Sequence, residues 1–309
     1  SSERKKIALF CNVGEKDVIP AVDVESIYEV PLSYHSVGLD QQVLKKFGLE
    51  YSDQLDIGRW QRILRGIKGP EGEVNIAVVG KYTGLRDAYI SLSEALTHGG
   101  FTNNVRVDIR WVDSEVFAKA GSPGALEDVH GILVPGGFGE RGTAGKVAAV
   151  TYAREERIPY FGICFGMQLA VIEAARNLLS FPEASSTEFG PCKDPVIGLM
   201  SEWLNEGSVE KRNADSDLGG TMRLGAYDAL IETGTRLAAI YGCRKISERH
   251  RHRYEVNVKY REQMEEVGFL FSALSPDGAL PEAIELKNHP WFIGVQFHPE
   301  LKSKPFAPH

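Results

Sequence analysis

Through the middle of the chain, short apolar runs alternate with segments whose apolar residues recur at helical spacing. Strands that alternate with helices in this way predict βαβ units and a mainly parallel sheet flanked by helices. Gly99-Gly100 is expected to end the first of these helices. The predicted strands are 74–80, 105–112, 132–134 and 158–163, and the predicted helices are 85–97, 144–156 and 167–175.

The N-terminal portion has a different pattern and is set apart by a polar stretch rich in glycine and proline. Residues 5–13 lead from a basic start into an apolar run that predicts a short buried strand, and 37–47 and 57–67 have helical spacing. These segments are too short and too interrupted to bury a core alone, which is consistent with the end of a larger domain. The predicted divisions are 1–67, the linker 68–73 and a second domain at 74–309.

The C-terminal half changes character again. Residues 180–220 are polar and contain proline and glycine, which predicts long surface loops. Beyond them, strand-like runs dominate, and one helix is predicted at 260–267. The predicted fold class is therefore α/β, an open, mainly parallel sheet with additional antiparallel strands from this half. These later strands are predicted at 223–231, 247–258, 269–273, 283–287 and 291–297.

Composition narrows the classes of function. The 309 residues carry a formal net charge of −7, with 25% charged and 43% hydrophobic residues, as in ordinary globular proteins. Such a chain offers no broad basic surface for nucleic acid, and no apolar run reaches the roughly 20 residues of a membrane span. The first residue is Ser1, so we expect a fragment or a processed chain. Cys11, Cys164, Cys192 and Cys243 form no Cys-x-x-Cys pair, which favours a reduced, cytoplasmic setting over a zinc or disulfide framework.

Cys164 lies at the sharpest predicted turn, between an apolar strand and a helix. The sequence Gly162-Ile163-Cys164-Phe165-Gly166 has the order of a nucleophile elbow, with a thiol in place of a hydroxyl. Its glycines permit a tight turn, and the positive N-terminal end of the helix favours a thiolate. The alternative is a buried structural cysteine, because cysteine is among the most buried residue types.

Two other strand ends carry groups that suit the same chemistry. The run at 291–297 leads to His298, which can take the thiol proton, and to Glu300, which can orient the imidazole. The run at 131–134 ends in a glycine-rich turn whose backbone N–H groups can bind an oxyanion. Ligands of parallel sheets bind at the carboxyl ends of the strands, where Gly137 and Cys164 are both expected.

Together and in this order, Pro135-Gly136-Gly137-Phe138-Gly139, the elbow and Gln296-Phe297-His298-Pro299-Glu300 resemble the class I (triad) glutamine amidotransferases. Further stretches are similar to the glutaminase half of the CTP synthases, and 7–13 and 24–28 are similar to the tail of their synthetase half, so the resemblance covers nearly the whole chain. These further stretches are Gly80-Lys81-Tyr82-Thr83 with Asp87-Ala88-Tyr89, Gly220-Thr221-Met222-Arg223-Leu224-Gly225, and residues 248–257.

The resemblance implies a flavodoxin-like fold and hydrolysis of glutamine through a thioester. Cys164 would be the nucleophile, His298 its base and Glu300 the orienting carboxylate. The backbone N–H groups of Gly137 and Phe165 would form the oxyanion hole, with Phe165 standing where the family commonly has leucine. The glutamine-contacting positions of the family fall on Gly137, Phe165, Gly166, Met167, Gln168, Glu188 and Arg253.

The resemblance also implies partners beyond this chain. In the family, ammonia passes to a synthetase domain of the same polypeptide, where ATP and magnesium activate UTP for amination to CTP. No cofactor or metal is expected in this chain, and glutamine hydrolysis is the one activity expected of it alone. GTP would act as an allosteric activator near Phe138 and Arg141, and the full-length enzyme would form tetramers that can assemble into polymers.

Several other interpretations remain open at this point. His250 and His252 lie on one face of a predicted strand, but a third metal ligand is not in view. Lys146 follows a glycine-rich loop without the spacing of a Walker A motif. Glu188, in Ser-Ser-Thr-Glu, also fits a helix-capping box. Another class I amidotransferase or a γ-glutamyl hydrolase would share the fold, and a non-catalytic assembly module would not need all three triad residues.

Overall fold

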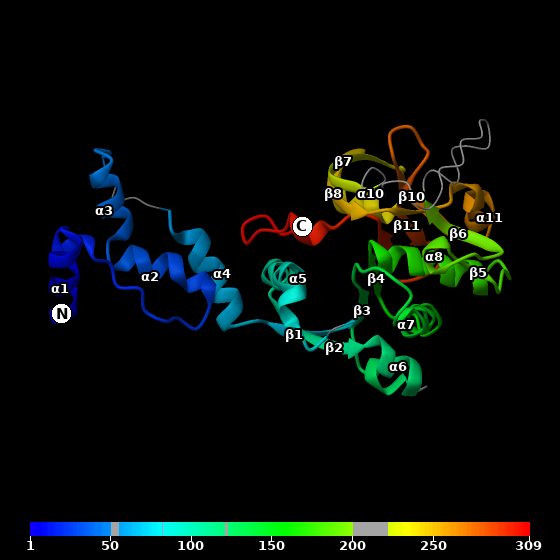
Figure 1. Cartoon of the computed structure of the whole chain (residues 1–309), viewed down its shortest axis with the longest axis horizontal. Coiled ribbons are helices and arrows are strands. Elements are labelled where there is room, and N and C mark those ends of the chain that lie inside the picture. The colour runs from blue at the N-terminus through cyan, green and yellow to red at the C-terminus, as the bar shows by residue number, and fades with distance from the viewer. Residues whose placement is uncertain (51–55, 82, 121–122, 200–221) are drawn as a thin grey trace. The chain divides into compact units, whose positions relative to one another are not determined.

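The structure is a computed structural model that describes residues 1–50, 56–81, 83–120, 123–199 and 222–309 (Figure 1). These residues form two compact units. The first, called the helical unit below, contains Ser1–Gly72 and Gly100–Arg106. The second, called the sheet unit, contains Glu73–Gly99 and Val107–His309.

The helical unit has two helices where helical spacing predicted them, at 37–47 and 57–67. The predicted strand at 5–13 is wrong, because this segment belongs to a helix that Ser1 caps by accepting a hydrogen bond from the amide of Arg4. An apolar run this short does not distinguish a strand from a helix by its period. The helices are α1 (Ser2–Cys11), α2 (Val30–Ser36), α3 (Leu39–Lys46) and α4 (Gly58–Lys68).

The sheet unit is built on a sheet of nine strands among the described residues, in the order β2-β1-β3-β4-β12-β11-β10-β7-β8. Strands β1, β3, β4 and β12 pair in parallel, and the strands from β12 to β8 pair antiparallel. This is the predicted α/β fold, with parallel strands at its centre. The strands are β1 (Gly72–Gly80), β2 (Val105–Asp113), β3 (Gly131–Val134), β4 (Tyr160–Ile163), β7 (Arg223–Ile231), β8 (Lys245–His252), β10 (Phe269–Leu274), β11 (Pro281–Leu286) and β12 (Phe292–Val295).

Helices cover both faces of this sheet. Ala77 and Val79 of β1 lie in a core with α7 and α8, whereas Val78 lies in a second core with residues of α5 and α10. Burial on both faces explains why the central strands are continuous apolar runs. None of the helices in the described segments is long and apolar enough to cross a membrane. The helices are α5 (Ile90–Thr102), α6 (Ser114–Ala120), α7 (Thr143–Glu155), α8 (Phe165–Asn177), α10 (Arg236–Tyr241) and α11 (Arg261–Glu266).

Two predicted boundaries are wrong for local reasons. Helix α5 continues through Gly99 and Gly100, because neither glycine takes the positive φ that commonly ends a helix. The strand predicted at 247–258 divides at Arg253 into β8 and β9 (Tyr254–Val256), which belong to different sheets.

The prediction of surface loops over 180–220 is wrong for its first part. Strands β5 (Ala184–Ser186) and β6 (Asp194–Leu199) form a second sheet with β9. Strand β6 pairs with β9 through Ile197 and Val256, so a partner about 60 residues away in the chain decides its conformation. Residues 200–221 of that prediction lie outside the described residues. Helices α2, α6 and α10 were not predicted.

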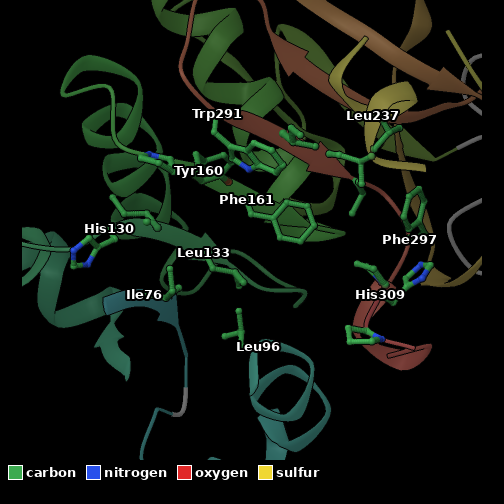
Figure 2. A pocket seen from close by; sticks show the side chains of 18 of the residues that line it. Ile76, Leu96, His130, Leu133, Tyr160, Phe161, Leu237, Trp291, Phe297 and His309 are labelled. Atoms are coloured by element: carbon green, nitrogen blue, oxygen red, sulfur yellow. The ribbon is translucent and has the colours of Figure 1, made fainter. Parts of the chain in front are cut away.

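A cavity of about 600 Å³ opens beside the second core (Figure 2). Its lining is mainly apolar, and Figure 2 shows Leu133 and Phe161 of the sheet, Leu96 of α5 and His309 around it. Cys164, His298 and Glu300 are not among its lining residues. This cavity is therefore separate from the candidate active site.

Candidate active site

Cys164 connects β4 to α8 in a strained conformation. Its φ and ψ are 52° and −102°, and only 2% of the residue is exposed. Gly162 and Gly166, by contrast, do not have positive φ values. Gly166 is required by space, since a Cβ there would lie 2.0 Å from the carbonyl oxygen of Val134 in β3. The strain therefore lies on the candidate nucleophile itself, and Gly166 allows α8 to pack closely on the sheet.

The parallel pairing of β4 with β12 aligns Cys164 with His298. Ile163 pairs with Val295, and the amide of Cys164 donates to the carbonyl oxygen of Val295 at 2.7 Å. Three residues beyond Val295, the amide of His298 donates to the carbonyl oxygen of Arg249 at 2.8 Å. Both side chains therefore leave the carboxyl ends of adjacent parallel strands, where ligands of such sheets bind.

The imidazole of His298 is held by a carboxylate and fits against a glycine. Nδ1 lies 2.7 Å from Oε1 of Glu300. A Cβ on Gly136 would lie 2.7 Å from Cε1 of the ring, so the ring occupies space that only glycine leaves free. Burial lowers the pKa of His298, but the nearby Cys164 and the hydrogen-bonded Glu300 outweigh it and raise the pKa to about 10. This environment favours the imidazolium form of His298.

The two residues predicted to form an oxyanion hole lie next to each other. A Cβ on Gly137 would be 3.7 Å from Cδ1 of Phe165, the first residue of α8. The first N–H groups of a helix have no partner within it, so that of Phe165 suits an anion. Gly166 and Met167 follow in the same turn and are buried, and the carbonyl oxygen of Gly166 accepts from the hydroxyl of Tyr160 at 2.9 Å.

Glu188, the carboxylate predicted to bind a substrate ammonium, lies against the glycine-rich loop after β3. Oε1 of Glu188 accepts from the amide of Gly139 at 2.6 Å, and burial raises the pKa of Glu188. Phe189 contacts Phe165 edge to face, with ring centroids 6.1 Å apart. The capping-box interpretation of Glu188 is wrong, because Ser186 caps the short helix by accepting from the amide of Glu188 at 3.1 Å, while the Glu188 carboxylate bonds Gly139 instead.

Gln168 and the segment around Arg253 meet at the start of α8. Nε2 of Gln168 donates to the carbonyl oxygen of Tyr254 at 2.8 Å and to Oε1 of Gln296 at 3.1 Å. Arg253 precedes Tyr254 in the break between β8 and β9 and is half-buried. The structure therefore brings the segments that carry Gln168, Arg253 and Cys164 to the same end of the sheet.

The two residues linked with GTP lie on the loop after β3. Phe138 is 50% exposed, and Nε of Arg141 lies 2.6 Å from Oε1 of Glu115. Nζ of Lys81 donates to the carbonyl oxygens of Phe138 and Gly139 at 2.8 and 3.2 Å and holds the loop. Tyr82 of the same motif lies outside the described residues.

Five buried polar or charged residues form a cluster near β7 and β8: Arg223, His250, His252, Glu255 and Glu282. Arg223 bonds the carboxylates of Glu255 and Glu282 at 3.2 and 2.7 Å, and Nδ1 of His250 lies 2.9 Å from Nε2 of His252. Burial raises the pKa of Glu255 to about 8, although Arg223 opposes this shift.

The described residues contain no group of three or more side chains suited to a metal. The alternation predicted for 249–253 places the two histidines inside, with Arg249 and Arg251 exposed. Gly220 and Thr221, in the motif that includes Arg223, lie outside the described residues.

Lys146 of α7 is a buried cation beside Gly137 and Phe165. It is 1% exposed, its Nζ would lie 3.4 Å from a Cβ on Gly137, and it lies 5.1 Å from the ring centroid of Phe165. Burial and, to a smaller extent, the charge of Lys81 lower its pKa from 10.5 to about 8, while Cys164 opposes the shift. A lowered pKa means that the folded state disfavours the protonated form, so this lysine destabilises the fold fully below about pH 8 and not above pH 10.5.

Lys146→Met is therefore expected to raise the free energy of unfolding at pH 7 by about 1–3 kcal/mol, because it removes a desolvated charge at similar volume. Urea unfolding at pH 7 and again above pH 10.5 would measure the gain, which should shrink at the higher pH. Lys287→Met makes the same change at an exposed position and is the control. Equal stability of Lys146→Met and the parent chain at pH 7 would contradict the expectation.

Sequence reasoning missed the site roles of Gly136, Lys81, Lys146 and Gln296. Gln296 had a detectable signal, since it is a polar residue within the apolar run at 291–297, and it is fully buried. A polar group in a buried strand needs a hydrogen-bond partner, which makes such a residue a candidate for an internal network. The other three have no comparable signal, because their roles depend on contacts across the fold.

Comparison with known proteins gives the family. The family model described as glutamine amidotransferase class-I matches residues 85–309, and the one described as CTP synthase N-terminus matches residues 1–49. The chain is 63% identical over 308 residues to the CTP synthase of Acidiphilium cryptum, over 99% of this chain and 57% of the relative. It is 60% identical over 308 residues to the CTP synthase of Rhizobium etli, over 100% of this chain and again 57% of the relative.

A solved structure agrees with these matches. The glutaminase domain of Trypanosoma brucei CTPS with bound acivicin is 39% identical, with a TM-score of 0.65, over 76% of this chain and 89% of that one. The chain spans about 57% of the length of the CTP synthases it matches. Because the amidotransferase model covers most of the sheet unit, including the elbow and the ends of β3 and β12, the chain belongs to the class I glutamine amidotransferase family, and its relatives over nearly its whole length are CTP synthases.

Proposed function

We propose that this chain hydrolyses glutamine to glutamate and ammonia, with Cys164 as the nucleophile, His298 as its base and Glu300 as the orienting carboxylate. The observation that carries the proposal is the alignment of Cys164 and His298 at the ends of paired strands, with Nδ1 of His298 2.7 Å from Glu300. The family match over 85–309 supports the same reaction.

In the first half of the reaction, the thiolate of Cys164 attacks the side-chain amide carbon of glutamine and forms a C–S bond. The amide oxygen becomes an oxyanion, to which the N–H groups of Gly137 and Phe165 donate. The imidazolium of His298 gives its proton to the amide nitrogen, the C–N bond breaks, and ammonia leaves a thioester behind.

In the second half, neutral His298 takes a proton from water while the water oxygen attacks the thioester carbon. The C–S bond then breaks, glutamate is released, and the thiolate and imidazolium are restored. Glu300 stabilises the imidazolium in both halves, as its 2.7 Å contact with Nδ1 allows.

Recognition of free glutamine needs an anion for its ammonium and donors for its carboxylate. Glu188 supplies the anion, and Arg253 supplies the guanidinium. Both are half-buried and lie on segments held against the start of α8. The main chain of Gly166 and Met167, together with Gln168, completes the proposed glutamine site.

The activity of the whole protein is a wider part of the proposal, because the chain spans about 57% of its relatives. Residues 1–67 are the end of a synthetase domain, 68–73 are a linker, and 74–309 are the amidotransferase domain. Ammonia from Cys164 serves the amination of UTP to CTP, with ATP and magnesium bound in the synthetase domain. The whole enzyme is a cytoplasmic homo-oligomer. GTP activates it at Phe138 and Arg141, an exposed ring and a cation on one loop.

The test is glutamate and ammonia release from free glutamine by the whole chain, together with labelling by a chloroketone analogue of glutamine. We expect glutamate and ammonia to be released in equal amounts. We also expect peptide mass mapping to locate the label on Cys164, and glutamine to protect Cys164 from labelling. Asparagine, one methylene shorter, is the control substrate and should react poorly. Stimulation by GTP would support the CTP synthase part of the proposal, and a preference for γ-glutamyl peptides would favour a hydrolase instead. If glutamate is not released and Cys164 is not labelled, the proposed function is overturned.

Glu300→Gln is expected to move the alkaline limb of the pH profile of kcat/KM down by about 1–3 pH units. Glu300 is one of the two groups that raise the pKa of His298 to about 10, so the imidazolium loses its proton at a lower pH without this charge. Initial rates of glutamate release across neutral and alkaline pH would measure the limb. Glu262→Gln, at an exposed position of α11, is the matched control. An unchanged alkaline limb in Glu300→Gln would count against the role of Glu300.

A further inference from the structure

A chain of buried amide groups runs from the main chain of β9 to the sulfur of Cys164. The carbonyl oxygen of Tyr254 accepts from Nε2 of Gln168 at 2.8 Å, and this Nε2 also donates to Oε1 of Gln296 at 3.1 Å. Nε2 of Gln296 then lies 3.7 Å from Sγ of Cys164. Gln296 and Gln168 are 0% and 3% exposed, so the chain of contacts lies inside the protein.

The first contact decides the direction of all the others. A main-chain carbonyl oxygen can only accept, so Gln168 must turn its NH2 group toward Tyr254. The second hydrogen of that NH2 group points at Gln296, which must therefore present its carbonyl oxygen. The NH2 group of Gln296 is left facing Sγ. Reversing the Gln296 amide would place two donors against each other at one end and an oxygen lone pair against the sulfur at the other.

The backbone holds this donor at the sulfur. The amide of Gln296 donates to the carbonyl oxygen of Glu282 at 2.8 Å, and the amide of Cys164 donates to that of Val295 at 2.7 Å. These bonds keep the two residues on neighbouring strand ends. An NH2 group has no acceptor to offer a thiol proton, whereas it can donate to a thiolate, and burial strengthens such a bond to a charged acceptor.

We propose that Gln296 is a positioning residue of the nucleophile, which donates a hydrogen bond to the thiolate of Cys164 and is oriented by Gln168 and the carbonyl oxygen of Tyr254. It acts on the opposite partner of the ion pair from Glu300: Glu300 stabilises the imidazolium of His298, and Gln296 stabilises the thiolate. The inference rests on Cys164 being the nucleophile of the proposed function. It also gives Gln168 a structural task besides contact with glutamine.

The test is the pH dependence of alkylation of Cys164 by iodoacetamide, read on its own peptide by mass spectrometry. Gln296→Met keeps length and burial but has no N–H group, and Gln296→Asn keeps an amide that is one methylene too short to reach. Both should raise the midpoint of the alkylation profile by about 0.5–1 pH unit, because less thiolate forms at a given pH. Gln168→Met should move it in the same direction by less, since the Gln296 amide is then free to turn.

Gln263→Met makes the same change at an exposed position of α11 and should leave the midpoint unchanged. A folded Gln296→Met or Gln296→Asn protein whose midpoint equals that of the parent chain, or lies below it, would overturn the proposal. Failure of both Gln296 variants to fold, judged by circular dichroism, would assign the amide chain to stability and overturn it as well.

Iodoacetamide needs no glutamine site, so this result is distinct from the fate of the proposed function. A parent chain that does not hydrolyse glutamine can still show a midpoint that Gln296→Met raises. In that case the hydrogen bond from Gln296 to the thiolate is supported, while the assignment of glutamine as substrate fails. If the parent chain hydrolyses glutamine but the Gln296 variants keep its alkylation midpoint, the proposed function stands and the role of Gln296 fails.

Discussion

Replacing Cys164 by alanine is expected to lower glutamine hydrolysis by more than about 10⁴-fold, since loss of a covalent nucleophile removes the thioester route altogether. The contacts of His298 with Glu300 and of Gln296 with Gln168 do not involve the sulfur and should remain. Purified parent and variant chains would be compared by glutamate release at saturating glutamine. The chloroketone analogue should also fail to label the variant.

The effect on folding should be small by comparison. Alanine adopts the backbone of Cys164 no less easily than cysteine does, and the loss of one buried sulfur costs about 1 kcal/mol. Cys243→Ala, which removes an exposed thiol, is the matched control and should keep full activity. If Cys164→Ala hydrolysed glutamine at a rate near that of the parent, the covalent mechanism would have to be abandoned.

Gly166→Ala is expected to lower the free energy of unfolding by more than about 4 kcal/mol or to prevent folding. The added Cβ would lie 2.0, 2.9 and 3.2 Å from the carbonyl oxygen, carbonyl carbon and Cβ of Val134. These atoms belong to the central strand β3, so no flexible side chain can move aside. Relief would require α8 to move away from the sheet, and α8 begins at Cys164.

Urea unfolding followed by circular dichroism would measure this loss. Gly99→Ala is the control, because a Cβ at Gly99 in α5 would meet no atom within 4 Å. There the change should stabilise the protein by about 0.5–1 kcal/mol through helix propensity. A Gly166→Ala protein within about 1 kcal/mol of the parent would show that the strand and helix can separate at little cost.

The motifs quoted from the sequence were sufficient to predict the elements around the candidate nucleophile. Cys164, His298 and Gly137 each lie within three residues of the end of an apolar run, and each run forms a strand of the parallel centre. Parallel strands carry their carboxyl ends to one edge, so local patterns in three separate segments were enough to place the three groups there. The same local patterns failed at 5–13 and 184–199, where the conformation depended on capping or on a distant strand.

The sequence by itself determined the fold class, the family and the residues proposed for catalysis, because these depend on periodicity and on motifs that are contiguous in the chain. Only the tertiary structure decided that Gly136 makes room for the imidazole, that Lys146 is a buried cation, and that Gln296 turns a donor toward the sulfur. Each of these features joins residues far apart in sequence; Gln296 and Cys164 are separated by 132 positions. The direction of an amide and the solvation of an ammonium depend on which groups surround them, and that is settled only when the strands pair and the helices pack on the sheet.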